Sequence, residues 1–337
     1  MDTPLLEPKS EGPPVLVQQA LPEAVREWQW QRCSSGFSGA VLWRALDDQG
    51  NPRMVLKGWP VDVLSERLHQ IHQWMELANH LPYVPRLYRW RTGGTVLDQI
   101  GRCWDLTSWQ MGEVCRQPDL LEVSQACRAV AQLHAAWPQY GYGTCPAARH
   151  RWEWLERWQQ LPLPVDMLRR QYPPWEDVLQ AAERILREQV QPTLKRLQSW
   201  LGREGPLQVC LRDLRSEHVL FFRSGSLIQV SGIIDYGAMA IDHPAVDLAR
   251  LLADYAAAQP ERAAGIYAAG QQAYQDAGGN LQPWLHHLPL LAHAGHLAAL
   301  VRWLVRLAAK NLPESVTLPL VFARLEELLR RLENPST

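Results

Sequence analysis

Short stretches of alternating apolar and polar residues occupy the first third of the chain, whereas most of the remainder carries apolar residues at helical spacing. Alternation is typical of β-strands, and recurrence along one face is typical of amphipathic helices. The strand-like stretches are also rich in β-branched and aromatic residues, which favours the same interpretation. They are residues 28–33, 41–45, 53–57, 84–90 and 95–100, with a turn at 47–51.

The helical pattern dominates from residue 119 onward and also occurs once earlier. A strand-rich part followed by a mostly helical part predicts an α+β fold. The chain has 337 residues, which is long enough for two lobes that each bury a core. The helix-like stretches are residues 61–80, 119–137, 150–160, 176–201, 245–258, 260–275, 283–309 and 318–334.

Three regions are expected from this pattern. Residues 1–24 are rich in Pro, Glu and Ser without periodicity, which indicates a flexible tail. Residues 25–108 hold most of the strand-like stretches and form the predicted N-terminal lobe. Residues 109–337 form the predicted helical C-terminal lobe.

Composition narrows the class of protein. Hydrophobic residues make up 47% and charged residues 20%, as in globular domains, and the net charge of −1 gives no support to nucleic-acid or membrane-surface binding. The apolar stretch 285–307 carries several His and Arg residues, so we expect it to be a core helix and not a membrane span. The six cysteines show no zinc spacing, and no signal peptide opens the chain, which favours reduced thiols and a cytoplasmic location.

Two carboxylates flank a predicted hairpin. Residues 219–222 and 227–234 read as its strands, with a turn around Gly225. Asp213 precedes this hairpin and Asp235 follows it, so both acidic side chains are expected to face one small space, with His218 between them in sequence. Two carboxylates in one space repel each other, and a divalent cation relieves that repulsion.

These residues resemble the catalytic centre of the aminoglycoside phosphotransferase and choline kinase family. The resemblance rests on Asp213 with His218 shortly after it, the hairpin, Asp235-Tyr-Gly237, and the segment 242–249 that contains Asp247. It implies a protein-kinase-like fold with a small antiparallel-sheet lobe and a larger helical lobe. It also implies an ATP-dependent (or GTP-dependent) kinase that phosphorylates a hydroxyl of a small molecule, with Mg²⁺ as metal and the nucleotide between the lobes.

The resemblance assigns roles in the C-terminal lobe. Asp213 matches the catalytic base, Asp235 matches the metal-binding Asp, and His218 stands where the family has a metal-binding Asn. Arg212 is a candidate for offsetting charge near the γ-phosphoryl group, and Asp247 is expected to hold the catalytic loop. Leu211 stands where the family usually has His. The substitutions at 211 and 218 leave a second interpretation open: a catalytically inactive nucleotide-binding or interaction module.

The same resemblance assigns nucleotide contacts in and next to the N-terminal lobe. The turn after the first strand is expected to approach the phosphates, Lys57 to bind them, and an acidic residue of the first long helix to pair with Lys57, for which Glu66 is preferred over Glu76. The chain leading into the second lobe is expected to contact the adenine. Read without the resemblance, these would be an ordinary turn, an exposed Lys and Glu, and a plain linker. The candidate residues are Gly36, Ser38, Gly39, Lys57, Glu66, Trp109 and Met111.

Overall fold

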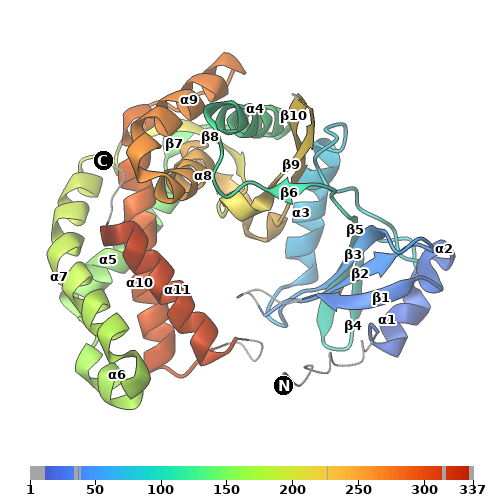
Figure 1. Ribbon diagram of the computed structural model, residues 1–337, viewed down its shortest axis with the longest axis horizontal. Coiled ribbons are helices and arrows are strands. Elements are labelled where there is room, and N and C mark those ends of the chain that lie inside the picture. The colour runs from blue at the N-terminus through green and yellow to red at the C-terminus, as the bar shows by residue number, and fades with distance from the viewer. Residues whose placement is uncertain (1–11, 34–36, 38, 226, 313–315, 334–337) are drawn as a thin grey trace. The chain divides into compact units, whose positions relative to one another are not determined.

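The computed structural model describes residues 12–333 except 34–36, 38, 226 and 313–315. The described chain divides between Gln110 and Met111 into two compact units, here called the N-terminal and C-terminal units. Their elements are labelled in Figure 1.

A five-stranded antiparallel sheet forms the N-terminal unit, in the order β1-β2-β3-β5-β4, with helix α3 (Ser65–Leu77) following β3. The predicted strand at 84–90 is wrong, because this stretch forms only an isolated bridge, Leu87 to Thr107. Pro85 lacks an N–H group and cannot join a continuous ladder. The strands are β1 (Gln29–Cys33), β2 (Val41–Leu46), β3 (Pro52–Gly58), β4 (Val96–Gln99) and β5 (Arg102–Ser108).

The segment 12–24 differs from the tail that its composition suggested. It contains helix α1 (Val15–Ala20) and the start of α2 (Glu23–Arg26). Val17, Leu21 and Val25 recur at helical spacing, and all three are buried in one core cluster with residues of β1, β2, β3 and β5. Three buried apolar side chains therefore anchor a segment that is rich in Pro and Glu, and the mean composition of this segment does not reveal them.

Helices make up most of the C-terminal unit. The apolar prediction for 285–307 corresponds to α10, whose region Leu285–Ala308 is long and apolar enough to cross a membrane, but 72% of that window is buried inside the protein, as in a core helix. The helices are α4 (Leu120–Ala136), α5 (Pro146–Gln160), α6 (Val165–Gln171), α7 (Glu176–Gln198), α8 (Ala245–Ala258), α9 (Ala263–Asp276), α10 (Leu288–Ala308) and α11 (Leu318–Glu333).

Two three-stranded sheets in the C-terminal unit position the site. One has the order β10-β9-β6 and contains the predicted hairpin, which is confirmed by the pairing of Val219 with Ile233 at its open end. The other has the order β11-β8-β7 and joins the strand before Asp213 to the strand after Asp235. The strands are β6 (Glu113–Val114), β7 (Gln139–Thr144), β8 (Glu204–Cys210), β9 (Val219–Ser224), β10 (Leu227–Ile233) and β11 (Ala240–Asp242).

Candidate active site

A buried carboxylate fixes the loop that follows β8. Asp247, in the first turn of α8, is fully buried and accepts hydrogen bonds from the backbone N–H groups of Leu211 (2.7 Å) and Arg212 (2.6 Å). Arg212 has a φ of 67°, a left-handed conformation that costs about 1–3 kcal/mol for a residue other than glycine. The charge-assisted hydrogen bonds that Asp247 accepts from this turn offset that cost, and they fix the position of the next residue, Asp213.

Asp247 is itself held by a histidine. The Nε2 atom of His134 on α4 lies 3.0 Å from Asp247 Oδ2, and its Nδ1 atom lies 2.8 Å from the hydroxyl of Tyr274 on α9. A neutral imidazole meets both partners when Nε2–H donates to the carboxylate and Nδ1 accepts from the hydroxyl. Nothing in the local sequence around Asp247 pointed to His134, because the two residues are far apart along the chain.

Cys210 approaches the same carboxylate and imidazole, and the ligand atoms of Cys210, His134 and Asp247 lie within 4.8 Å of one another. Burial raises the pKa of the Cys210 thiol well above its ordinary value, and the Asp247 charge adds to this effect. The Asp247 oxygens already accept three hydrogen bonds from groups of the protein. We therefore interpret this cluster as structural.

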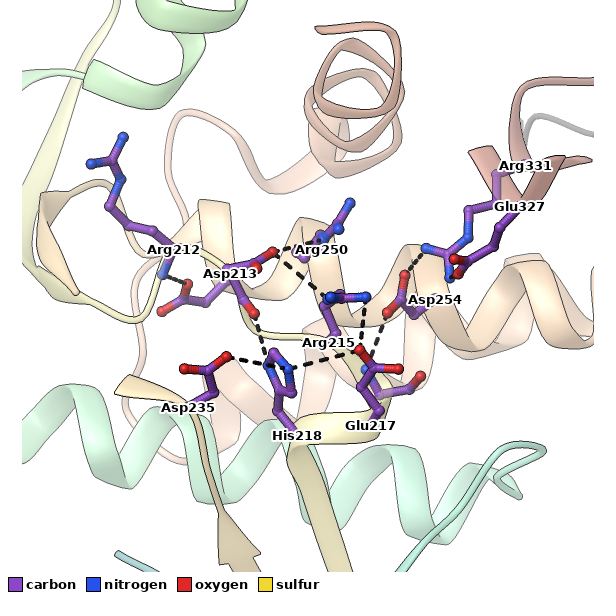
Figure 2. Close-up of polar contacts among 12 residues, drawn as sticks. Arg212, Asp213, Arg215, Glu217, His218, Asp235, Arg250, Asp254, Glu327 and Arg331 are labelled. Carbon is purple, nitrogen blue, oxygen red and sulfur yellow. Dashed lines mark hydrogen bonds and ion pairs between the residues drawn. The ribbon is translucent and has the colours of Figure 1, made fainter. Parts of the chain in front are cut away.

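His218 links the two predicted acidic residues. Its Nδ1 atom lies 2.9 Å from the backbone carbonyl oxygen of Asp213, so Nδ1 must carry the proton that makes this bond. The lone pair of a neutral ring is then on Nε2, which lies 3.8 Å from Asp235 Oδ2 and 3.9 Å from Glu217 Oε1. Figure 2 shows the imidazole between the main chain of Asp213 and the Asp235 side chain.

The Asp213 carboxylate faces arginines. Its Oδ1 atom lies 3.5 Å from Arg250 Nε and 3.9 Å from Arg215 Nε, and the side chain remains 46% exposed. In Figure 2 these two guanidinium groups approach the carboxylate on the side away from Asp235. Asp213 therefore presents a reachable carboxylate to one side and its carbonyl oxygen, through His218, to Asp235 on the other.

Arg212 is engaged elsewhere. Its Nε atom lies 3.0 Å from Oδ2 of Asp242, a fully buried residue at the end of β11. Burial raises the pKa of Asp242, and the Arg212 charge opposes that rise. Asp235 also has a left-handed backbone, with φ of 63°, so both turns that flank the hairpin hold strained residues.

Lys57 of the N-terminal unit lies half-buried on β3, directly opposite Asp105 of β5 in the sheet register. Its Nζ atom lies 3.9 Å from the centre of the Trp59 ring, and Trp59 Nε1 donates to Asp105 Oδ2 at 2.7 Å. Asp105 also lies 3.1 Å from Nε2 of His72 on α3. No local sequence pattern indicated this network, because its members come from separate parts of the chain.

Glu66 is exposed in the first turn of α3 and forms no ion pair with any residue that the structure describes, so its pairing with Lys57 stays a prediction. His72, further along the same helix, connects α3 to the sheet through Asp105 of β5.

The remaining candidates lie in turns and in the connection between the units. Gly39 has a φ of 80°, whereas Gly36 and Ser38 fall outside the described residues. Trp109 donates its backbone N–H to the Arg53 carbonyl at 2.9 Å, and the Met111 side chain is 61% exposed.

Comparison with known proteins gives one family. A family model described as "Phosphotransferase enzyme family" matches residues 29–284. No curated protein sequence matches the chain.

Solved structures show the same kinase-like fold at low sequence identity. A structure of amicoumacin kinase in complex with AMP-PNP, Ca²⁺ and Ami has a TM-score of 0.62 at 13% identity, covering 96% of this chain and 94% of that one. Spectinomycin phosphotransferase in complex with ADP and spectinomycin has a TM-score of 0.58 at 10% identity, covering 90% and 92%. Plasmodium vivax ethanolamine kinase has a TM-score of 0.55 at 12% identity, covering 91% and 80%.

Proposed function

Because the chain belongs to the phosphotransferase enzyme family, we propose that it transfers the γ-phosphoryl group of ATP or GTP to a hydroxyl of a small molecule. The observation that carries this proposal is the loop that presents Asp213. Its backbone is fixed by the buried Asp247, and its carboxylate remains 46% exposed beside the hairpin that ends at Asp235. Phosphoryl transfer needs positioned groups more than reactive ones, and a fixed loop with a reachable carboxylate supplies such positioning.

Asp213 acts as the base in this proposal. Its carboxylate accepts a hydrogen bond from the acceptor hydroxyl, orients the oxygen, and takes the proton as the oxygen attacks phosphorus. Arg250 and Arg215 restrain the carboxylate from one side, which limits its rotamers and keeps it aimed at the acceptor.

Asp235 and His218 are the residues that would hold a divalent cation. The donor set fits, because the bond from Nδ1 to the Asp213 carbonyl leaves the lone pair of Nε2 on the Asp235 side. The cation, when bound, neutralises charge on the nucleotide phosphates. Mg²⁺ prefers oxygen ligands, whereas Mn²⁺ accepts imidazole readily, so we expect Mn²⁺ to support binding at least as well as Mg²⁺.

On the N-terminal unit we assign the nucleotide phosphates to Lys57 and to the turn that contains Gly39, and the adenine to the connection at Trp109 and Met111. Trp59 and Asp105 orient Lys57 in this assignment. They hold the β3–β5 face on which its side chain lies.

An inactive nucleotide-binding module is the second candidate. Leu211 favours it, since this buried side chain brings no polar group to a position where the family usually has His. His218 favours it as well, since an imidazole stands where the family usually has a metal-binding Asn and Mg²⁺ prefers oxygen ligands. Nucleotide binding that ignores Mg²⁺ and Mn²⁺, without transfer to any acceptor, would support this candidate.

The test is Asp213→Asn. ADP formation is measured with a panel of small alcohols and with water as acceptors, and nucleotide affinity is measured by calorimetry. Loss of the base should lower the transfer rate by about 10²–10⁴-fold and change nucleotide affinity little. Asp166→Asn, at an exposed carboxylate of α6, is the matched control and should behave as the unaltered protein. Retained transfer in Asp213→Asn would remove Asp213 from the role of base.

A further inference from the structure

One face of α8 contacts the catalytic loop (residues 211–218) through three charged side chains. Asp247, Arg250 and Asp254 recur at intervals of three and four positions, a spacing that places side chains on the same face of a helix. Asp247 accepts the N–H groups at the start of the loop, and Arg250 lies 3.5 Å from the Asp213 carboxylate. Asp254, about two helical turns after Asp247, contacts the other end of the loop.

Asp254 holds the backbone at this second end. Its Oδ2 atom accepts the backbone N–H of Ser216 at 3.1 Å, and Ser216 begins the single 3₁₀ turn η2 (Ser216–His218). A helical turn leaves its first N–H groups without partners inside the turn, so an acceptor from outside must satisfy them. The buried carboxylate supplies that acceptor, and its charge makes the hydrogen bond stronger than a neutral one.

The turn that Asp254 holds ends at His218, the candidate metal ligand. The His218 carbonyl accepts the Ile234 N–H at 2.9 Å, and its ring Nδ1 donates to the Asp213 carbonyl at 2.9 Å. Because the turn is only three residues long, a shift of Ser216 displaces His218 as well. Asp254 therefore influences the position of the imidazole through the backbone.

The C-terminal helix in turn holds Asp254. Arg331 of α11 donates from Nη1 to Asp254 Oδ1, and from Nη2 to Glu327, which lies one turn earlier on the same helix. Figure 2 shows Arg331 on one side of the Asp254 carboxylate and the catalytic loop on the other. The two carboxylate oxygens therefore have different partners, one in the loop and one in α11.

Both contacts need an ionised carboxylate. Burial by itself would raise the pKa of Asp254, but the charges of Arg250 and Arg331 and the Ser216 N–H outweigh burial and hold the pKa below its ordinary value. Asp254 is therefore charged in the folded protein at neutral pH. A buried carboxylate is costly to leave partly unpaired, so loss of one of its partners should weaken its contact with the other.

We propose that Asp254 is a positioning residue of the catalytic loop and that Arg331 orients it, so that the C-terminal helix fixes the position of His218. The inference rests on the proposed function and adds to it two residues outside the hairpin and its flanking turns. Asp247 fixes the loop before Asp213, and Asp254 fixes it after. A segment held at both ends keeps its catalytic groups in place with less reorganisation than a segment held at one end.

Amide hydrogen exchange of the full chain measures how firmly the loop is held, and it needs neither metal nor nucleotide. An asparagine has one acceptor oxygen, so Asp254→Asn can keep the Ser216 bond or the Arg331 contact but not both. We expect exchange of the amides of residues 213–218 to become at least about tenfold faster in Asp254→Asn. Arg331→Gln should act in the same direction, and Arg331→Lys should restore part of the protection because it keeps the charge.

Leu328→Ala is the control for a general weakening of α11. Leu328 is fully buried on the same helix, and its truncation leaves a cavity that lowers stability, which urea unfolding measures. If this network only packs α11, Leu328→Ala and Asp254→Asn should accelerate loop exchange alike, and that result would overturn the proposal. Unchanged loop exchange in Asp254→Asn would overturn it too. Should Asp254→Asn not fold, Arg331→Gln takes its place in the same comparison.

Metal dependence tests the step from Ser216 to His218. In Asp254→Asn we expect the Mn²⁺ concentration that half-saturates AMP-PNP binding to rise by about tenfold, because a displaced imidazole is a poorer ligand. Leu328→Ala should leave this concentration unchanged. An unchanged Mn²⁺ requirement in Asp254→Asn would overturn this step.

Exchange and transfer together separate this inference from the proposed function. Asp213-dependent transfer in the unaltered protein, with normal loop exchange in Asp254→Asn, would support the phosphotransferase and overturn the positioning role. Faster loop exchange in Asp254→Asn than in Leu328→Ala, in a protein that transfers phosphate to no acceptor, would support the positioning role and count against the phosphotransferase.

Discussion

Each of the two units contains a chain of hydroxyl, imidazole and buried carboxylate. In the N-terminal unit, Thr95 Oγ1 lies 2.9 Å from Nδ1 of His72, whose Nε2 lies 3.1 Å from Asp105. In the C-terminal unit, Tyr274 and Asp247 contact the same two nitrogens of His134 at 2.8 and 3.0 Å. In both, the carboxylate is at most 4% exposed, so the histidine serves to hold it.

The two carboxylates differ in what else they bind. Asp247 accepts two backbone N–H groups of the loop that presents Asp213, whereas Asp105 accepts the side-chain N–H of Trp59, on whose ring the Lys57 ammonium lies. One therefore fixes a strained backbone, and the other fixes a side chain on an otherwise regular strand. No backbone pairing replaces the hydrogen bonds that Asp247 accepts from the strained turn, whereas strand pairing holds β3 and β5 together without Asp105.

The largest expected effect is that of Asp247→Asn. An amide cannot accept from two backbone donors and a histidine together, so we expect unfolding free energy to fall by about 3–5 kcal/mol and transfer to be lost. Urea unfolding and ADP formation measure the two effects. Asp276→Asn, at an exposed carboxylate of α9, is the control. A loss of unfolding free energy below about 1 kcal/mol would mean that the turn at Arg212 keeps its conformation without the Asp247 carboxylate.

Acid should destabilise the C-terminal unit through His243, next to α8. This histidine is fully buried, donates from Nε2 to the Gln282 carbonyl (2.9 Å), accepts the Ala245 N–H at Nδ1 (3.1 Å), and burial lowers its pKa to about 4. Between pH 6.5 and about 4 the unfolded chain binds a proton that the folded chain does not, so stability falls as pH falls through this window. Through His243 alone, the free energy of unfolding is expected to fall by about 3 kcal/mol across this pH window.

Urea unfolding from pH 7 to pH 4.5 measures this dependence, and His243→Gln should flatten it. His293 and His296 on α10 also have lowered pKa values because of burial, so part of the slope should remain. An unchanged slope in His243→Gln would show that this ring is protonated in the folded protein.

Asp105→Asn should have a smaller effect than Asp247→Asn. It removes one charge-assisted acceptor from two side-chain donors, so we expect a loss of about 1–3 kcal/mol and a severalfold weaker nucleotide affinity through Lys57. Asp98→Asn, at an exposed carboxylate of β4, is the control. Trp59→Phe keeps the ring beneath Lys57 but removes the donor, and it should reproduce the stability loss with less effect on nucleotide binding. Equal losses in Asp105→Asn and Asp247→Asn would abolish the distinction between the two units.

The smallest effect is expected for Glu66→Gln. Glu66 is exposed and unpaired within the described residues, so stability should change by less than about 0.5 kcal/mol and nucleotide affinity by less than about twofold. Calorimetry with AMP-PNP measures the affinity. A tenfold loss would show that Glu66 reaches Lys57 when nucleotide binds.

The predicted part of the site lies in one continuous stretch of sequence. Asp213, the hairpin, Asp235 and Asp247 follow one another closely, and strand pairing alone brings the ends of the hairpin together. The α+β class and most helices were also predictable, because hydrophobic periodicity is a local property. The helix at 15–20 was missed because three buried apolar residues count for little in a Pro-rich average.

The sequence by itself therefore determined which carboxylates flank the hairpin and which family pattern they follow. Only the tertiary structure decided that His72 connects α3 to Asp105, that His134 supports Asp247, and that Arg250 and Arg215 approach Asp213. These contacts join residues from separate elements, such as His134 and Asp247, which are 113 positions apart. Packing brings such groups together, and no local pattern of residues records which distant side chains will meet.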